Sequence, residues 1–151
     1  MATNLYDTDF VAWTKEQAAE LRRLRDARIN TPLDLELLGS EQRFAVRSFV
    51  IRAIEHLLNL EFSTATEPRA LWLRSLRNAR KSAERRMTVT LRRDLEERLP
   101  KLFDDARDEV AFALEHYREF AALEQLPFAN PYSLDQILDP DWLPPEPQAR
   151  D

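Results

Sequence analysis

The sequence is poor in the residues that tight turns and covalent cross-links require. Among its 151 residues there is one glycine, Gly39, and no cysteine. Hairpin turns depend on glycine, which adopts positive φ without strain, so a fold rich in β-hairpins is disfavoured. Without cysteine there is no disulfide, thiolate nucleophile or cysteine-ligated metal. Dinucleotide and P-loop sites need several glycines around the phosphates, and both are therefore excluded.

Long apolar runs and a targeting segment are also missing. No run approaches the ~20 residues that a membrane-spanning helix needs. Residues 1–7 lack the basic and apolar parts of a signal peptide. We therefore expect a cytoplasmic protein with no membrane association. The chain is 44% hydrophobic and long enough for one domain with its own core. We place this domain at residues 1–143 and expect residues 144–151 to be a proline-rich flexible tail.

Hydrophobic spacing predicts an all-α fold, a single-domain bundle of five to six helices. Apolar residues recur every three to four positions over about residues 8–27, 41–61, 69–86 and 91–120. A short helix that begins near Thr31 is expected to end at Gly39. Pro100 predicts a kink or a boundary between two helices. The β-branched residues Thr88 to Thr90 predict a break after the helix over 69–86.

The helix over residues 41–61 is expected to form the centre of the bundle. Apolar residues occupy more than half of its circumference, so other elements must cover it on several sides. Its most central side chains, Ile54, Leu57 and Leu58, should be almost fully buried.

The C-terminal part is expected to contribute a short capped helix and an anchor. Ser133 and the glutamine three residues later form a capping box. Trp142 and Leu143 follow, and we expect them to fold back onto the bundle. The predicted landing site is either an apolar surface around Phe112 and Leu123 or the edge of the first helix near Trp13.

Charge is distributed unevenly behind a net charge of −5. Residues 69–93 carry nine basic and one acidic side chain, whereas residues 104–151 carry three basic and twelve acidic ones. Arginines on one side of a helix would bind phosphates and give salt-dependent nucleic-acid binding. The candidate basic patch consists of Arg74, Arg77, Arg80, Lys81, Arg85 and Arg86. We favour internal pairing of the arginines, across an antiparallel helix pair, with Asp104, Asp105, Asp108, Glu109, Glu115 and Glu119.

The two histidines offer little support for catalysis. Each follows a glutamate, but alanine stands three residues before each, so the Glu-x-x-His pattern of di-iron bundles fails at both. A looser metal half-site of Glu115, His116 and Glu119 is less favoured than a solvated charged face. No serine or aspartate is placed by sequence to complete a catalytic triad. We expect no catalytic residue, no metal site and no cofactor.

A candidate binding surface combines His56 and its neighbours with residues of a later helix. Phe112 and Leu123 flank His116 away from the main apolar stripe of their helix, which indicates a covering segment or a partner. The surface consists of Arg52, Glu55, His56, Phe112, His116 and Leu123. The leading function is a protein-interaction or regulatory module that binds another protein or itself. A nucleic-acid-associated protein is the alternative, and a hydrolytic or metal-dependent enzyme comes third.

Three stretches of the sequence resemble a known family. They are residues 6–13 (YDTDFVAW), 55–61 (EHLLNLE) and 131–144 (PYSLDQILDPDWLP). With residues 38–41 and 72–80 between them, their order and spacing resemble the bacterial domain of unknown function 29 family over nearly the whole chain. The resemblance implies an all-helical domain and no assigned activity. The chain departs from the family pattern in a shorter second helix and at Asn59, where lysine is usual.

Overall fold

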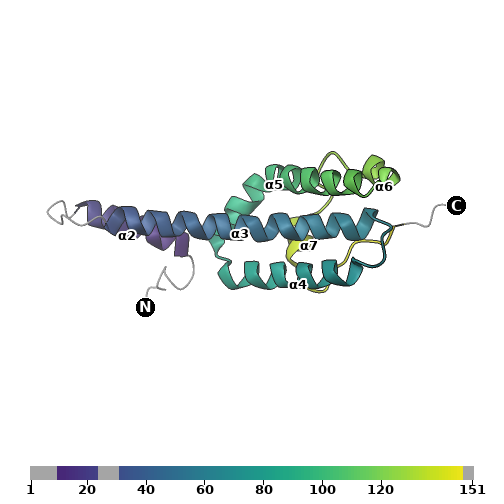
Figure 1. Cartoon of the computed structure of the whole chain (residues 1–151). Coiled ribbons are helices and arrows are strands. Elements are labelled where there is room, and N and C mark those ends of the chain that lie inside the picture. Colours follow the sequence, from purple (N-terminus) through teal and green to yellow (C-terminus); the bar gives the residue numbers. More distant parts are fainter. Residues whose placement is uncertain (1–9, 24–30, 148–151) are drawn as a thin grey trace.

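The molecule is built around one long helix, α3, which other helices cover on two sides. The computed structural model describes residues 10–23 and 31–147. Its helices are α2 (Phe10–Arg23), α3 (Thr31–Phe62), α4 (Arg69–Arg86), α5 (Val89–His116), α6 (Phe120–Gln125) and α7 (Leu134–Leu138). These ranges contain six helices and no strand, so the predicted all-α bundle is confirmed. Figure 1 shows α4 and α5 on opposite sides of α3, and α7 contacts all three.

The core lies around the middle of α3, as predicted. Ile54, Leu57 and Leu58 are fully buried. The helices around them each contribute buried side chains, among them Leu76 of α4, Phe103 of α5 and Ile137 of α7. Charged residues interrupt even the longest helix, α3. No helix in the described part of the chain is long and apolar enough to cross a bilayer.

Gly39 lies inside α3, so the expected helix end at this residue is wrong. Its φ is not positive, and the helix continues to Phe62. The glycine allows a close approach of α2 instead: a Cβ at this position would lie 2.8 Å from Oγ1 of Thr14. Thr14 is buried, and its hydroxyl donates a hydrogen bond to the carbonyl of Val11. Long-range packing therefore overrides the ordinary role of glycine as a helix terminator.

α4 runs antiparallel to α3 after a short loop. Arg69, the first residue of α4, donates hydrogen bonds to the carbonyl oxygens of Leu60 and Ser63 at the end of α3. Arg86 in the last turn of α4 lies over the ring of Phe49, 5.3 Å from its centroid. These contacts at both ends fix the alignment of the two helices.

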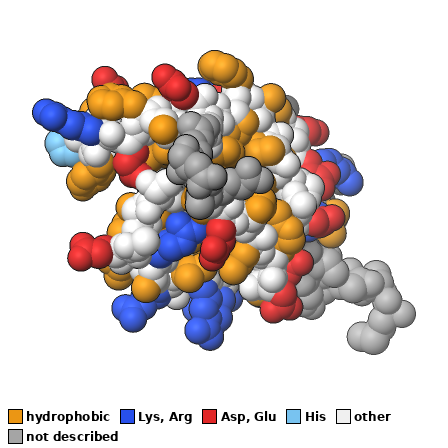
Figure 2. Space-filling model, turned by 90° about the vertical axis from the view of Figure 1, so that its right-hand side faces the viewer, with side chains coloured by type: hydrophobic (Ala, Val, Ile, Leu, Met, Phe, Trp, Pro, Cys, Tyr) orange, Lys and Arg blue, Asp and Glu red, His pale blue; other side chains and the backbone are white. Residues whose placement is uncertain are grey.

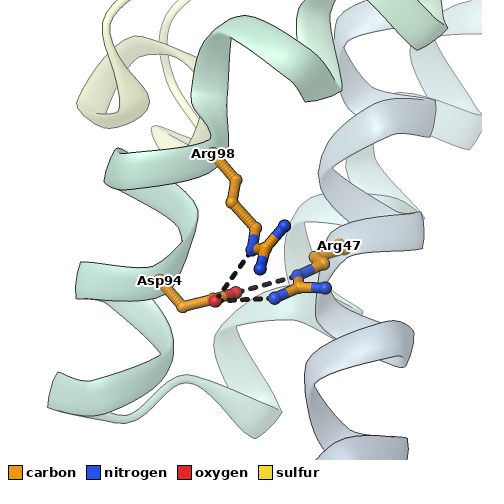
Figure 3. A network of polar contacts seen from close by, with 3 residues as sticks. All are labelled: Arg47, Asp94 and Arg98. Atoms are coloured by element: carbon orange, nitrogen blue, oxygen red, sulfur yellow. Dashed lines mark hydrogen bonds and ion pairs between the residues drawn. The ribbon is translucent and has the colours of Figure 1, made fainter.

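α5 runs parallel to α3 on the other side. Near the start of α5, Asp94 accepts hydrogen bonds from Arg47 of α3 at 2.6 and 2.9 Å and from Arg98 at 3.3 Å (Figure 3). Burial opposes the charged form of Asp94, but the two arginines outweigh it and hold its pKa below the ordinary value. Just beyond the other end of both helices, Ser63 donates a hydrogen bond to Glu119. The C-terminal ends of α3 and α5 therefore lie at the same end of the molecule.

α5 is a single bent helix. Thr88 caps it through its side chain, which confirms the break predicted there. Pro100 lies inside it, and Figure 1 shows the helix changing direction part way along. The expectation that this helix extends to Phe120 is wrong, because α5 ends at His116. Arg118, with a φ of 59°, turns the chain before α6 begins.

The short helix α7 begins with the capping box predicted from the sequence. Ser133 Oγ accepts a hydrogen bond from the N–H of Gln136, whose side chain accepts one from the N–H of Ser133. Pro144, further along, is buried, and residues 148–151 lie outside the described part. The division into a domain over residues 1–143 and a tail stays a prediction.

Trp142 folds back onto the bundle, but it does not cover Phe112. Its ring packs against that of Tyr132, with the centroids 5.8 Å apart, and it lies against the hydrophobic core. Leu143 lies beside α4 and remains half exposed. The expected cover over Phe112 is absent, because the Phe112 side chain is 71% exposed. The alternative site, at the side chain of Trp13, lies outside the described residues.

Candidate functional site

Three residues of the predicted surface lie close together on α3, and one of them, Glu55, is near α5. Arg52 is exposed, and Glu55 and His56 are half-buried. Burial raises the pKa of Glu55 above its ordinary value, and the negative charge of Glu109 on α5 adds to this rise, while Arg52 opposes it. The structure therefore brings a carboxylate of α3 close to one of α5.

His56 is a histidine whose neutral form is favoured. Burial lowers its pKa, and the positive charge of Arg52 lowers it further. Its Nδ1 is buried and has no hydrogen-bond partner among the described residues. A general base acts on a group within hydrogen-bond reach. No hydrogen bond in the described part links His56 to a nucleophile, so the arrangement gives no support for catalysis.

The predicted residues of the later helix are only partly brought together with those of α3. Phe112 is exposed, and it lies three residues after Glu109 and four before His116, so these side chains share one face of α5. That face borders Glu55 through Glu109. Leu123 is different: it belongs to α6 and packs against the hydrophobic core. Glu109 adds a carboxylate next to the candidate surface, which stays a prediction.

The basic segment divides into an exposed face and a buried anchor. Arg80 is only 4% exposed, and it donates hydrogen bonds to the carbonyl oxygens of Ile137, at 2.8 Å, and Gln136, at 3.0 Å. Burial lowers its pKa, and Asp139 counteracts the shift. Arg80 therefore joins α7 to α4 and is not part of a surface patch. The exposed members of the predicted patch are Arg74, Arg77, Lys81, Arg85 and Arg86.

The predicted pairing of the α4 arginines with the acidic residues of α5 is wrong. It required α4 and α5 to be antiparallel neighbours, but α3 lies between them (Figure 1). Over residues 10–23 and 31–147, no ion pair joins an arginine of α4 to a carboxylate of α5. Asp105 instead pairs with Lys101 of its own helix at 2.7 Å, and Arg92 of α5 pairs with Asp135 of α7.

The residues of the looser metal half-site do not come together. His116 and Glu119 do not share a helical turn, because α5 ends at His116. His116 packs edge-to-face on Tyr117, with ring centroids 5.1 Å apart. Glu119 instead accepts hydrogen bonds from Ser63 Oγ at 2.8 Å and from the N–H of Thr64 at 3.1 Å. In the described ranges no group of three or more His, Cys, Asp or Glu side chains is arranged to hold a metal ion.

A cleft opens at the end of the molecule where α3 and α5 end and α4 begins. We call it the end cleft; its volume is about 630 Å³. Its lining includes polar, acidic and aromatic side chains from all three helices and their connections, among them Asn59, Thr64, Glu67, Trp72, Tyr117 and Glu119. Figure 2 looks onto this end of the molecule, where hydrophobic, acidic and basic side chains lie interspersed.

Two aromatic rings and a fixed carboxylate give the end cleft its shape. Trp72 is half-buried, and Tyr117 is 74% exposed. The hydrogen bonds from Ser63 and Thr64 hold Glu119 in position. The sequence does not reveal this cleft, because apolar residues at helical spacing continue through Tyr117 and predict that it faces the core. Only the chain reversal after His116 turns it outward.

A second cleft, of about 570 Å³, lies between α4 and residues 132–143, which we call the C-terminal segment. Leu138 and Leu143 line it together with Arg77, Arg80 and Lys81 of α4. Because Glu84 and Asp141 also line it, cationic and anionic side chains face the same space. This cleft marks where the C-terminal segment docks on α4.

Comparison with known proteins agrees with this fold. The family model described as Domain of unknown function DUF29 matches residues 5–143. An α-helical protein of unknown function from Rhodospirillum rubrum is similar in structure, with a TM-score of 0.77 and 20% sequence identity, over 93% of this chain and 92% of that one. At this identity the likeness shows the fold alone. A search among curated proteins finds no match. The family match spans nearly the whole chain, which therefore belongs to the family of domain of unknown function 29.

Proposed function

We propose that this domain is a cytoplasmic interaction module that binds a partner protein through the end cleft. The observation that carries the proposal is a cleft of about 630 Å³ with the rings of Trp72 and Tyr117 in its lining. Its volume lies within the range of ordinary binding pockets. Tryptophan and tyrosine supply a large share of binding energy in protein interfaces, because they bury much apolar surface and keep a polar group.

The surface beside the end cleft also supports binding. Phe120, three residues after Tyr117, is 53% exposed although it is large and apolar. Neighbouring exposed aromatic side chains are typical of protein-binding sites.

The test compares partner capture by the wild-type chain and by Tyr117→Ala. A suitable control is Phe128→Ala, which removes an aromatic side chain that is 87% exposed and does not line the cleft. Each variant is used for affinity capture from the native host, and both protein and nucleic acid are identified. A protein captured by the wild type and the control but not by Tyr117→Ala is then purified. Its affinity for each variant is measured by calorimetry.

The proposal expects the purified partner to bind Tyr117→Ala at least about tenfold more weakly, a difference of about 1.4 kcal/mol. Equal affinities for wild type and Tyr117→Ala would exclude the end cleft as the binding site. If the captured protein is a second copy of the chain, the module is self-associating. In that case the chain does not bind a different protein, but the end cleft is still its binding site.

Nucleic-acid binding remains a second candidate because of the outer face of α4. Arg74, Arg77, Lys81 and Arg85 are exposed and lie at helical spacing along one side. The acidic residues of α5 do not neutralise them. In Figure 2, Lys and Arg side chains project along the lower edge of the molecule, where α4 lies. This arrangement is typical of a phosphate-binding helix.

A fluorescence titration against generic duplex DNA and RNA decides between the two candidates. An interaction module with a net charge of −5 should show no micromolar binding at moderate salt. Micromolar, steeply salt-dependent binding that is lost in Arg74→Glu/Lys81→Glu would promote the nucleic-acid function. Glu84→Gln, also on α4, serves as a control that does not remove positive charge.

A further inference from the structure

The end cleft has an unusual balance of charge for this molecule. The carboxylates of Glu67 and Glu119 line it, and no lysine, arginine or histidine is among the described residues of its lining. Both acidic residues belong to connections between helices, Glu67 just before α4 and Glu119 just after α5, whereas α4 itself is rich in arginine. A cationic group entering this space meets two carboxylates and no like charge from the lining.

The aromatic side chains of the end cleft favour the same kind of ligand. A guanidinium or ammonium group is attracted to the face of an aromatic ring, most strongly to tryptophan. Trp72 and Tyr117 supply two such rings in one cleft with the carboxylates. An apolar ligand would gain from the rings alone, but it would bury the carboxylates without a partner, which is costly.

Glu119 is positioned in advance and keeps capacity for a ligand. Its Oε1 accepts hydrogen bonds from Ser63 Oγ and from the N–H of Thr64, whereas its Oε2 accepts one, from Ser63 Oγ at 3.0 Å. A carboxylate offers about four lone-pair sites. The side-chain oxygen of Asn59, in the same lining, is a further acceptor. A planar guanidinium with five donors matches such a set better than a compact ammonium does.

We infer that the end cleft binds a cationic side chain of the partner protein, with arginine as the preferred residue. The inference rests on the proposed function and specifies its chemistry. The guanidinium lies against Trp72 and Tyr117 and donates hydrogen bonds to Glu67 and Glu119. At about 630 Å³ the cleft is larger than one side chain, so it also takes the flanking backbone of the partner segment.

The test uses capped tripeptides and the full chain. Ala-Arg-Ala, Ala-Lys-Ala and Ala-citrulline-Ala are titrated up to millimolar concentrations, and the indole N–H of Trp72 is followed by NMR. Citrulline has nearly the shape of arginine without its charge. The inference predicts a saturable shift with Ala-Arg-Ala, weaker binding of the lysine peptide, and binding of the citrulline peptide that is weaker by about tenfold or more.

Two variants test the residues that make the site. Glu67→Gln removes one carboxylate from the lining, and Asn59→Lys places a cation in it; both should weaken Ala-Arg-Ala at least about tenfold. Glu84→Gln is the matched control, because Glu84 is also an exposed glutamate but lies on α4 and lines the other cleft. Its affinity for Ala-Arg-Ala should equal that of the wild type. Circular dichroism verifies that every variant is folded.

Failure of this inference is distinguishable from failure of the proposed function. Equal binding of the arginine and citrulline peptides, or unchanged affinity in Glu67→Gln and Asn59→Lys, would overturn cation recognition while leaving the end cleft as a binding site. Absence of any shift with the arginine peptide also overturns it. The proposed function depends separately on whether Tyr117→Ala loses the captured partner.

Discussion

Adjacent residues of α3 differ sharply in what they contribute, because a helix turns successive side chains toward different surroundings. Leu57 and Leu58 are fully buried, whereas Glu55 and His56, next to them in sequence, are half-buried and ionisable. A buried apolar side chain contributes about 1.5–3 kcal/mol to stability. A half-buried carboxyl makes stability depend on pH instead.

Leu57→Ala should lower the free energy of unfolding by about 2–5 kcal/mol, because it removes apolar atoms and leaves a cavity in the centre of the core. Urea denaturation followed by circular dichroism measures the change. Leu71→Ala, at a position 62% exposed, is the control and should change the free energy by no more than about 0.5 kcal/mol. Equal effects of the two substitutions would show that Leu57 is not central to the core.

Glu55→Gln should raise the free energy of unfolding near neutral pH. Burial and Glu109 raise the folded-state pKa of Glu55 above 4.5, so the folded protein binds this proton more tightly than the unfolded chain. The resulting stabilisation is complete below the unfolded pKa and is lost as pH rises through the folded pKa. Glutamine keeps the group neutral at every pH, and Glu109→Gln should give a smaller gain by removing only the charge repulsion.

Denaturation of wild type and Glu55→Gln at a series of pH values measures this difference. His56 has the opposite sign: its lowered pKa gives stabilisation that is complete above 6.5 and lost as pH falls through the folded pKa. Because both proteins contain His56, its contribution cancels in their difference. A difference that stays constant from acid to neutral pH would contradict the raised pKa of Glu55.

Single contacts between elements decide where helices continue and how they dock. α2 approaches α3 at Gly39, where only a hydrogen atom fits beside Thr14. On α4, the guanidinium of Arg80 donates hydrogen bonds to two carbonyl oxygens of α7. Each contact joins segments that are distant in sequence, and each gives a distinct expected effect on stability.

Gly39→Ala should destabilise the protein by about 1–3 kcal/mol, as overpacking of tight contacts does. The sign is informative, because alanine within an unhindered helix is instead more stable than glycine by about 0.5–1 kcal/mol. In a Thr14→Ala background the obstructing hydroxyl is gone, so the same substitution should be neutral or stabilising. Thermal or urea unfolding of the four variants measures the coupling. Additive effects would contradict the close contact.

Arg80→Lys should destabilise the protein by about 1.5–3 kcal/mol, the usual contribution of hydrogen bonds to charged groups. An ammonium group cannot reproduce the fork that reaches the carbonyls of both Gln136 and Ile137. Hydrogen exchange should become faster in α7. Arg77→Lys, at an exposed position of the same helix, is the control. Unchanged exchange in α7 would mean that Arg80 does not hold it.

The whole molecule depends on its C-terminal segment to close the core between α4 and α5. Tyr132, Leu134 and Ile137 are buried against the helices. The hydroxyl of Tyr132 donates a hydrogen bond to Glu61 of α3; burial and this bond raise the pKa of Tyr132. The segment returns along the chain from α6 and ends on α4. It therefore joins α4 to α5, which α3 otherwise separates.

Truncation after Pro131 should lower the melting temperature and increase the binding of a hydrophobic dye, with most of the helicity retained. Each buried side chain that is lost contributes about 1.5–3 kcal/mol, against a total stability of about 5–15 kcal/mol for a typical domain. Truncation after Pro147 is the control and leaves the core residues in place. If the longer truncation changes neither stability nor dye binding, Trp142 is better explained as a docking element for a partner.

Features that depend on neighbouring residues were predictable from the sequence. The capping box at Ser133 follows from hydrogen bonds within one turn, and the break at Thr88 from β-branched residues. The buried face of α3 around Leu57 follows from helical periodicity. Of the candidate surface, Glu55 lies close to Glu109 of α5, whereas Leu123 is partly buried against the core.

The sequence by itself determined the all-α class and the polar and apolar faces of the helices, because composition, spacing and caps act over a few residues. Only the tertiary structure decided that Gly39 stays helical, that Arg80 is buried, and that α3 separates the arginines of α4 from the acidic residues of α5. It also decided where Trp142 docks and that Tyr117 and Trp72 share a cleft. These outcomes depend on contacts such as that of Arg80 with Ile137, 57 residues apart. The energy of such contacts depends on how whole elements pack, which no local pattern specifies.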